Sequence, residues 1–216
     1  MIGVLLVDDH KLVRTGVRRI LEDAAGIEVT GEAESGEQAI EMVRQKKPDV
    51  VLMDVNMPGI GGLETTRKLL ASWPDLKVIV VSVHAQEPYP ARLLEAGALG
   101  YLTKDCAPDE IVTAVRQVHS GERYIAADIA RQLALSMISG GKQSPLDALS
   151  TREMQVMLMV TQGASIQTIS DKLCLSPKTV STYRYRLFQK LGVNNDVELT
   201  RLAMRFGLLE AGQADK

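Results

Sequence analysis

Apolar residues follow two spacings in the first half of the chain. Short, nearly continuous apolar runs alternate with segments whose apolar residues recur every three or four positions, as in buried strands and amphipathic helices. Ile2–Val7 shows the first spacing and fits a strand that is covered on both faces of a parallel sheet. Lys11–Asp23 shows the second spacing, with Val13, Val17 and Ile20 on one side of the expected helix.

Five such pairs of strand and helix follow one another along this half. The expected strands are Ile2–Val7, Glu28–Ala33, Asp49–Met53, Val78–Ser82 and Gly100–Leu102. The expected helices are Lys11–Asp23, Gly36–Gln45, Leu63–Ser72, Tyr89–Ala96 and Pro108–Ser120. This order predicts an α/β domain with a five-stranded, doubly wound parallel sheet.

Toward the other end of the chain only helical spacing is found. Ser150-Thr151-Arg152-Glu153 has the form of a capping box, in which a serine and a glutamate satisfy the first N–H groups of a helix. Ser176-Pro177 is an N-cap followed by proline at the first helical position. The first expected helix begins after Ser150 and ends near Gly163, and the second begins after Ser165. The third begins after Ser176 and ends near Leu191. The last begins at Asn194–Asp196 and ends near Gly207. An all-α domain is therefore expected here.

The segment between these two regions has the character of a linker. One further helix is expected at Asp128–Ser139, and Gly140–Pro145 has the composition of a flexible break. We therefore expect one domain at residues 1–122, a linker at residues 123–146 and a second domain at residues 147–212.

Composition and charge support two domains with different partners. The chain has 216 residues, of which 45% are hydrophobic and 24% charged, and these values exclude a disordered, collagen-like or disulfide-scaffold protein. Residues 1–122 carry 13 Lys and Arg against 19 Asp and Glu, whereas residues 147–212 carry 8 against 6. An acidic first domain and a basic second domain are expected to bind different partners.

Three features indicate a cytoplasmic protein that does not enter the membrane. The longest apolar runs, such as Val78–Val83, are far shorter than the roughly 20 residues that span a bilayer. No basic segment precedes the first apolar stretch, so a signal peptide is not expected. Cys106 and Cys174 lie far apart without metal-ligand spacing and are interpreted as reduced thiols.

Carboxylates stand where two of the expected strands end. Asp8 and Asp9 follow the first strand, and Asp54 follows the third directly. With the strand order 2-1-3-4-5 these strands are neighbours, so the three carboxylates converge in one crevice. Such a cluster raises its own pKa values unless a cation is bound, and oxygen ligands suit Mg²⁺. Asn56, in a Pro/Gly loop, is expected to add a backbone oxygen to the Mg²⁺ ligands Asp8, Asp9 and Asp54.

Two further polar residues end the fourth and fifth strands. Ser82 and Lys104 supply a hydroxyl and an ammonium that can bind an anion placed on the metal. An aspartate nucleophile, Mg²⁺, lysine and serine together suit phosphoryl transfer to Asp54. Flavin mononucleotide, the main competitor on such a fold, is disfavoured because Asp8-Asp9 would repel its phosphate.

A basic helix is expected in the second domain. Ile166–Leu173 and Pro177–Leu191 have the spacing of a helix-turn-helix, and no acidic residue lies between Ser176 and Gly192. Val180, Tyr183, Leu187 and Leu191 form the apolar stripe that is expected to be buried. In a DNA major groove, cations bind phosphates while hydroxyls and arginine read base edges; a solvated charged face is the alternative. The candidate DNA contacts are Lys178, Thr179, Ser181, Thr182, Tyr185, Arg186 and Lys190.

The motifs of the first domain resemble a known family. Val7-Asp8-Asp9, Met53–Gly59, Ser82 and Gly100–Lys104 are similar to the receiver domain of two-component response regulators, over residues 1–122. The resemblance implies that Asp54 accepts a phosphoryl group from a sensor histidine kinase and that Asp9 is the direct Mg²⁺ ligand beside Asp8. It also implies that Ser82 and Tyr101 form a switch pair and that Lys104 holds a phosphoryl oxygen.

The second domain extends this resemblance to the whole chain. Leu149–Glu153, Gly163, Ser176–Val180 and Leu191–Val193 resemble the LuxR-type helix-turn-helix, so the chain resembles the NarL/FixJ family of response regulators. Ser176–Arg186, followed by Asp196–Thr200, is similar to the GacA/UvrY branch of that family. This implies a transcription regulator of genes for small regulatory RNAs, answering a membrane-bound sensor kinase.

A homodimer is expected in the phosphorylated state. A single four-helix DNA-binding domain, called a reader below, offers only a few contacts to bases. Domains of this kind bind paired half-sites as dimers. The last helix carries more apolar residues than one face against its own domain requires, although a purely internal role is nearly as well supported. These residues are Val197, Leu199, Leu202, Ala203 and Phe206.

Two other functions remain open. An aspartyl-phosphate phosphatase would need an acid or base beside Asp54, but the nearby His10 and His84 are interpreted as loop residues. A phosphorelay module without DNA binding would have no use for the cations Lys178 and Arg186. We therefore expect no enzymatic activity beyond Mg²⁺-dependent self-phosphorylation of Asp54.

Overall fold

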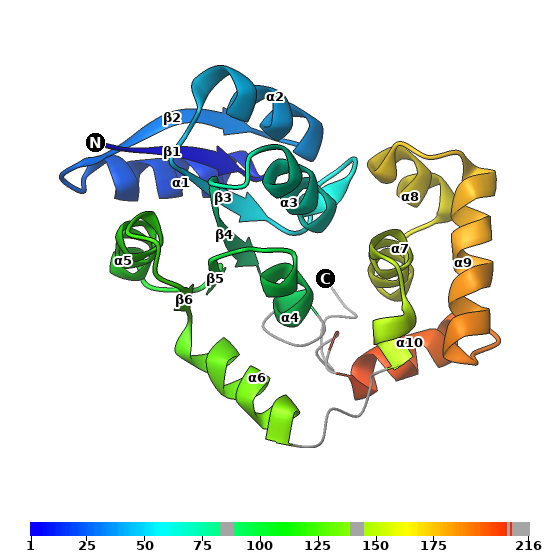
Figure 1. Ribbon diagram of the computed structural model, residues 1–216. Coiled ribbons are helices and arrows are strands. Elements are labelled where there is room, and N and C mark those ends of the chain that lie inside the picture. The colour runs from blue at the N-terminus through cyan, green and yellow to red at the C-terminus, as the bar shows by residue number, and fades with distance from the viewer. Residues whose placement is uncertain (83–88, 139–144, 207, 209–216) are drawn as a thin grey trace. The chain divides into compact units, whose positions relative to one another are not determined.

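The structure is a computed structural model that describes residues 1–82, 89–138, 145–206 and 208 (Figure 1). The chain divides into an N-terminal and a C-terminal unit, with the break between Arg131 and Gln132. Each unit has its own buried core and is described by itself. Most of the expected break at Gly140–Pro145, and His84, lie outside the described residues.

One parallel sheet forms the centre of the N-terminal unit. Its strands are β1 (Ile2–Val7), β2 (Ile27–Ala33), β3 (Val50–Asp54), β4 (Lys77–Ser82), β5 (Gly100–Thr103) and β6 (Tyr124–Ile125). They lie in the order β2-β1-β3-β4-β5-β6, so the predicted order of the first five strands is confirmed. Val7 pairs with Met53, which brings the carboxyl ends of β1 and β3 to the same edge.

The sheet has six strands, so the prediction of five was one short. The additional strand, β6, has only two residues and pairs through Tyr124 with Gly100 and through Ile125 with Tyr101. Two residues are too few to show the alternation by which strands are found in a sequence. The first residues of the expected linker therefore belong to the sheet.

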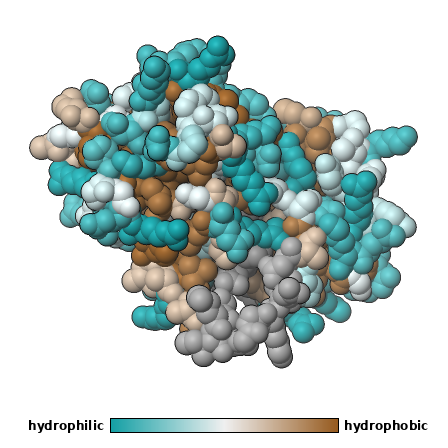
Figure 2. Space-filling view, in the orientation of Figure 1, coloured by the Kyte–Doolittle hydropathy of each residue, from teal (hydrophilic) through white to brown (hydrophobic). Residues whose placement is uncertain are grey.

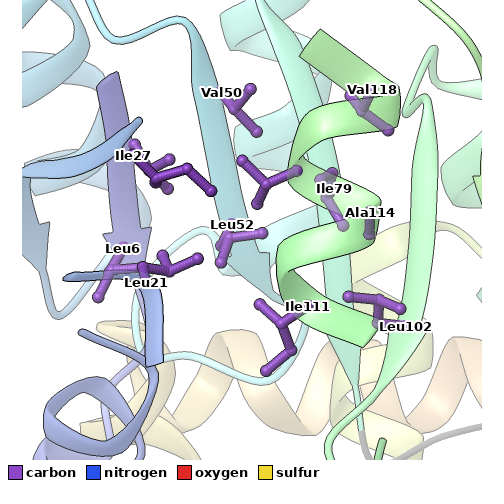
Figure 3. Packing of buried hydrophobic residues seen from close by; sticks show 12 residues of the cluster. Leu6, Leu21, Ile27, Val50, Leu52, Ile79, Leu102, Ile111, Ala114 and Val118 are labelled. Carbon is purple, nitrogen blue, oxygen red and sulfur yellow. The ribbon is translucent and has the colours of Figure 1, made fainter. Parts of the chain in front are cut away.

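Helices cover both faces of the sheet. They are α1 (Lys11–Glu22), α2 (Gly36–Lys46), α3 (Gly61–Ser72), α4 (Tyr89–Glu95) and α5 (Pro108–His119). Leu6 and Leu52 pack on one face with Leu21 of α1 and Ile111 of α5 (Figure 3). Leu5, the neighbour of Leu6 in the sequence, packs on the other face of the sheet. There it belongs to a buried cluster that includes residues of α2 and α3. Burial on both faces explains why the strands are apolar at consecutive positions.

The helix α6 (Ala127–Ile138) follows β6, close to the helix expected at Asp128–Ser139. The C-terminal unit then contains a short 3-10 turn, η1 (Pro145–Ala148), which was not predicted. Its helices are α7 (Thr151–Thr161), α8 (Ile166–Leu173), α9 (Pro177–Leu191) and α10 (Asp196–Arg205). Their core includes Leu146, Met154, Met157, Ile169, Leu173, Val180, Leu187, Leu199 and Ala203.

Side-chain caps fix where these helices begin. Ser150 and Glu153 form the expected capping box at α7, with the Glu153 carboxylate accepting from the Ser150 N–H at 2.7 Å. Ser165, Ser176 and Asn195 accept hydrogen bonds from backbone N–H groups at the starts of α8, α9 and α10. Among the helices that the structure describes, none has the length and hydropathy that a membrane crossing requires.

Candidate functional site

The edge of the sheet where the strands end carries a buried acidic pocket. Asp54 ends β3 and is 3% exposed, and Asp8 directly follows β1 and is 6% exposed. Lys104, just after β5, donates from Nζ to Oδ2 of Asp8 at 2.7 Å and to Oδ2 of Asp54 at 2.8 Å. Because β1 and β3 are neighbours, two carboxylates far apart in sequence share one ammonium.

Asp9 and His10 complete this cluster on its more exposed side. Nδ1 of His10 lies 2.9 Å from Oδ1 of Asp9 and 3.2 Å from Oδ1 of Asp8. One potential ligand atom each from Asp8, Asp9, His10 and Asp54 lies within 4.8 Å of the others. His10 was interpreted from the sequence as a loop residue, although its position directly after two aspartates was a signal that it lies at the pocket.

The pocket disfavours negative charge on Asp54. Burial raises the pKa of the Asp54 carboxyl from 3.8 to about 6, and the charge of Asp8 acts in the same direction. The hydrogen bond and positive charge of Lys104 oppose this shift. Burial lowers the pKa of Lys104, but Asp54 and Asp8 outweigh burial and raise it. A cation bound in the pocket would offset the repulsion between the negatively charged carboxylates.

The donor set fits Mg²⁺. Oδ1 of Asp9 is buried and has no hydrogen-bond partner among the described residues, since its contact with Nδ1 of His10 lacks hydrogen-bond geometry. A buried carboxylate oxygen without a donor is costly unless a cation binds it. Asn56 lies beside the same carboxylates, because its N–H donates to Oδ1 of Asp54 at 3.2 Å. Three carboxylates and neighbouring main chain form the oxygen-rich surroundings that Mg²⁺ prefers.

Ser82 and Tyr101 lie next to the pocket on neighbouring strands. Both side chains are fully buried, on β4 and β5 respectively. Burial raises the pKa of the Tyr101 hydroxyl, while its hydrogen bond with Ser82 acts to lower it, and the nearby charge of Asp54 adds to the rise. The two residues expected to form a switch pair are therefore hydrogen-bonded to each other.

Arg14 supports the pocket from α1, although no sequence pattern marked this residue as functional. Its side chain is buried, and Nη1 donates to the carbonyl oxygen of Asp8 at 2.6 Å. Nε donates to Glu32 at 3.0 Å, and Nη2 donates to Glu34. Glu32 lies on β2, and Glu34 directly follows this strand. Because these residues are far from Arg14 in the sequence, only the folded sheet reveals the network.

The loop after β3 depends on glycine. Gly59 has φ +75°, in the left-handed region, and the N–H of Ile60 donates to Glu37 of α2 at 3.1 Å. A Cβ on Gly62 would lie 2.0 Å from the carbonyl oxygen of Asp54. The close approach of α3 to the end of β3 therefore requires glycine at this position.

In the C-terminal unit, α8 and α9 form the expected helix-turn-helix. Cys174, with φ +52°, ends α8, and Ser176 caps α9 through the N–H of Thr179 at 3.1 Å. Val180 and Leu187 of α9 are fully buried, and Tyr183 and Leu191 are half-buried, so the predicted stripe faces the core. The opposite side of α9 exposes Lys178, Ser181, Thr182, Tyr185 and Arg186.

This exposed side of α9 differs in its contacts from the rest of the helix. In the part of the chain that the structure describes, Lys178 and Arg186 form no ion pair, whereas Arg184 donates to the carboxylate of Asp196 from Nε and Nη2. In Figure 2 hydrophilic and near-neutral residues cover most of the visible face of the C-terminal unit. The cations on this side of α9 are thus available to an anionic partner.

Several candidate DNA contacts have partners inside the domain. Within α9, Ser181 and Thr182 donate to carbonyl oxygens one turn earlier, and Gln189 donates to the hydroxyl of Tyr185. Thr179 is half-buried, and its Oγ1 lies 2.7 Å from Oγ of Ser176 at the start of α9. Lys190 donates from Nζ to Glu153 at 2.6 Å and to the carbonyl oxygen of Ala148 at 3.0 Å. Lys190 therefore joins α9 to α7 and to the turn before it.

Comparisons with known proteins agree with this division of the chain. Residues 4–116 match the response regulator receiver domain, and residues 147–203 match the bacterial regulatory proteins of the luxR family. Two solved structures, an RcsB–DNA complex and two RcsB dimers bound to two parallel DNAs, each match with a TM-score of 0.59 and 26% identity. Each match covers 94% of this chain and 98% of the other.

The chain therefore belongs to the two-component response regulators that join a receiver domain to a LuxR-type helix-turn-helix, and it is a DNA-binding regulator of transcription. Response regulator UvrY of Escherichia coli strain K12 is 58% identical over 212 residues, which are 98% of this chain and 97% of UvrY. Response regulator GacA of Pseudomonas aeruginosa strain PAO1 is 57% identical over 212 residues, which are 98% of this chain and 99% of GacA. The predicted similarity to the GacA/UvrY branch is confirmed, and the phosphatase alternative is not favoured.

Proposed function

We propose that Asp54 accepts a phosphoryl group from a sensor histidine kinase and that this step controls binding of DNA by the exposed side of α9. The observation that carries the proposal is the pair of buried carboxylates, Asp54 and Asp8, that share the ammonium of Lys104. This arrangement holds a nucleophile and an anion-binding cation side by side. The proposal does not include catalytic hydrolysis of other phosphoesters. It places the protein in the cytoplasm, where DNA is present.

Mg²⁺ is the proposed cofactor, held by Asp8, Asp9, Asp54 and Asn56. When bound, it supplies positive charge that lowers the repulsion between the Asp54 carboxylate and the donor phosphate. The carboxylate oxygen of Asp54 forms the new bond to phosphorus as the bond from phosphorus to the donor breaks. Lys104 exchanges its contact with Asp54 for a phosphoryl oxygen.

The Ser82 hydroxyl is placed to pass the change on to the rest of the domain. If Ser82 turns to donate to a phosphoryl oxygen, its hydrogen bond with Tyr101 is lost or rearranged. Tyr101 belongs to β5, so this rearrangement alters the side of the domain formed by β4, β5 and the helices beside them. Pairing of two copies is favoured only if the altered face has the higher affinity for its partner copy.

The phosphoacceptor is tested by intact-mass measurement after incubation with acetyl phosphate and Mg²⁺. The wild-type protein is expected to gain one phosphoryl group, and Asp54→Ala is expected to gain none. Removal of Mg²⁺ or Asp9→Asn should suppress the reaction. Asp75→Asn, at an exposed position outside the pocket, is the matched control and should react as the wild type does. Phosphorylation of Asp54→Ala at the wild-type rate would refute the assignment.

For DNA contact we propose Lys178, Thr179, Ser181, Thr182, Tyr185, Arg186 and Lys190. Lys178→Ala or Arg186→Ala should weaken binding and reduce the salt slope by up to about one unit for each lost phosphate contact. A residue that reads a base should instead relax the preference at one base pair by about 1–3 kcal/mol. Arg205→Ala, an exposed cation of α10, is the control. Unchanged salt slope and preference in both α9 variants would exclude this helix as the reader.

We further propose, from the resemblance to the GacA/UvrY branch, that the target genes encode small regulatory RNAs. Sequencing of DNA cross-linked to the protein in cells would test this. The proposed domains are residues 1–122 and 147–212 with a linker at 123–146. The break at Arg131 and the matches to residues 4–116 and 147–203 support this division.

A further inference from the structure

Arg14 is a buried arginine of α1 that reaches the main chain of the acidic pocket. Its side chain is 5% exposed, and Nη1 donates to the carbonyl oxygen of Asp8 at 2.6 Å. Its ion pairs within the described part of the chain are with Glu32 and Glu34, and not with Asp8 or Asp9. Arg14 therefore contacts the pocket through the carbonyl group of Asp8 rather than through a carboxylate.

The bond to Arg14 lies where β1 leaves the sheet. The N–H of Asp8 still donates to the carbonyl oxygen of Ala33 in β2, at 3.1 Å. The carbonyl group of Asp8 belongs to the same planar peptide unit as the N–H of Asp9. A donor that holds this carbonyl oxygen therefore fixes the plane that joins the two residues. The directions in which the Asp8 and Asp9 side chains leave the main chain are restricted by the same bond.

A guanidinium group suits this position better than an ammonium group. Its nitrogens lie in one plane and direct their N–H groups apart, so that Arg14 binds the Asp8 carbonyl, Glu32 and Glu34 at once. Arg18, one turn later in α1, donates to Glu32 at 2.6 Å and to Glu22 at 2.8 Å. The two arginines share a glutamate, but of the two only Arg14 bonds to Asp8 in the described structure. Arg18 thus provides an internal comparison.

We propose that Arg14 is a positioning residue for phosphorylation of Asp54. By holding the carbonyl oxygen of Asp8, Arg14 keeps the carboxylates of Asp8 and Asp9 directed into the pocket. Groups that orient metal ligands without touching the metal typically change its affinity by about 10- to 100-fold. This inference rests on the proposed function, because the orientation of these carboxylates matters to the reaction only if Asp54 is phosphorylated with Mg²⁺.

Arg14→Lys is the test variant, because lysine keeps the charge but presents all its donors from one nitrogen. Calorimetry gives Mg²⁺ binding to the full-length, unphosphorylated protein, and intact mass gives the phosphorylation rate at fixed acetyl phosphate and increasing Mg²⁺. Arg14→Lys should raise at least about tenfold both the Mg²⁺ dissociation constant and the Mg²⁺ concentration that gives half the maximal rate. At saturating Mg²⁺ the rate should recover to within about threefold of wild type, because Asp54 and Lys104 are unchanged.

Arg18→Lys is the matched control, since it changes the same helix and the same partner Glu32 without a bond to Asp8. It should leave both Mg²⁺ measurements within about twofold of wild type. Denaturant unfolding in a chelator compares the stability of the two variants, and circular dichroism checks that they are folded. A purely structural role of Arg14 would lower the free energy of unfolding without changing Mg²⁺ affinity, and that result would overturn the inference. An equal loss of Mg²⁺ affinity in Arg18→Lys would overturn it too.

A second pair of variants decides the question if Arg14→Lys does not fold. Glu34→Ala, at a side chain that is 65% exposed, removes the partner of Nη2 of Arg14 and should weaken Mg²⁺ binding about threefold. Glu22→Ala removes only a partner of Arg18 and should leave Mg²⁺ binding unchanged. Equal Mg²⁺ affinities of these two variants would overturn the inference. Absence of phosphate uptake by the wild-type protein would count instead against the proposed function.

Discussion

At the scale of single residues, the Asp54 carboxylate lowers the stability of the fold. Its folded-state pKa is about 6, above the ordinary value of 3.8, because the group is buried and close to Asp8. Between these two pH values the native state binds more protons than the unfolded state. The free energy of unfolding therefore falls as the pH rises through this window, and the deficit persists at neutral pH.

Asp54→Asn should accordingly make the metal-free protein more stable at neutral pH. Two pKa units correspond to about 3 kcal/mol, so an increase of about 1–3 kcal/mol in the free energy of unfolding is expected. The measurement is denaturant unfolding of both proteins in a chelator at several pH values. The difference between them should vanish below pH 4 and grow up to about pH 6. A difference that is constant with pH would show that burial of the charge is not its cause.

At the scale of elements, glycine sets the join between β3 and α3. A Cβ on Gly62 would meet the carbonyl oxygen of Asp54 at 2.0 Å, whereas a Cβ on Gly16, in the exposed part of α1, meets no atom within 4 Å. Gly62→Ala should therefore destabilise the protein by about 1–3 kcal/mol, as overpacking does, and slow phosphorylation of Asp54. Gly16→Ala should stabilise it by about 0.5–1 kcal/mol, because alanine is the better helix former.

Thermal unfolding and acetyl phosphate labelling of the two alanine variants provide this comparison. Both substitutions add the same methyl group, so differences between them come from the surroundings. Equal stability changes at Gly16 and Gly62 would mean that the loop after β3 adjusts without displacing Asp54.

An ion pair between Lys190 and Glu153 joins α9 to α7. Lys190 donates to Glu153, whose side chain is buried at the start of α7. Burial raises the pKa of Glu153, but the hydrogen bonds from Lys190 and Ser150 outweigh it and lower the pKa. This pair therefore stabilises the fold above the ordinary pKa of glutamate, and its contribution is lost as the pH falls toward the lowered value.

Lys190→Ala should reduce the free energy of unfolding of the protein by about 1–3 kcal/mol at neutral pH, because a buried charge loses its partner. Lys178→Ala, on the exposed side of the same helix, should leave stability nearly unchanged. Denaturant unfolding at neutral and acidic pH checks both. A reduced salt slope of DNA binding in Lys190→Ala would show a phosphate contact in addition, whereas unchanged stability would contradict the structural role.

The sequence predicted those parts of the fold that depend on local patterns. The alternation of the first five strands with helices along the chain, the capping box at Ser150 and the exposed side of α9 all follow from spacing and residue type. Features that depend on distant contacts were missed, such as the buried Arg14, the pairing of Lys190 with Glu153 and the short strand β6. His10 was missed for a different reason, because a histidine before a helix has several roles and only the folded loop shows where its ring points.

At the scale of the whole molecule, the proposed homodimer connects phosphorylation of the first domain with DNA binding by the second. In α10, Leu199 and Ala203 are fully buried, whereas Val197 is 62% exposed and Met204 is 45% exposed. Part of the apolar surface expected on the last helix is thus available for pairing. One of the solved structures that this chain resembles contains two RcsB dimers bound to two parallel DNAs.

Phosphorylation should therefore tighten binding to an inverted repeat far more than binding to a single half-site. A dimer holds its second reader at a high local concentration, so the gain on the inverted repeat should exceed the gain on the half-site at least about tenfold. Binding of both DNAs is measured with and without acetyl phosphate and Mg²⁺, and light scattering gives the mass of the free protein. Val197→Asp should remove the extra gain on the inverted repeat while half-site binding persists, because a charge opposes burial of this surface. Asp54→Ala should show no response on either DNA. Equal gains on the two DNAs, or an unchanged mass, would refute the dimer mechanism and leave DNA binding by α9 intact.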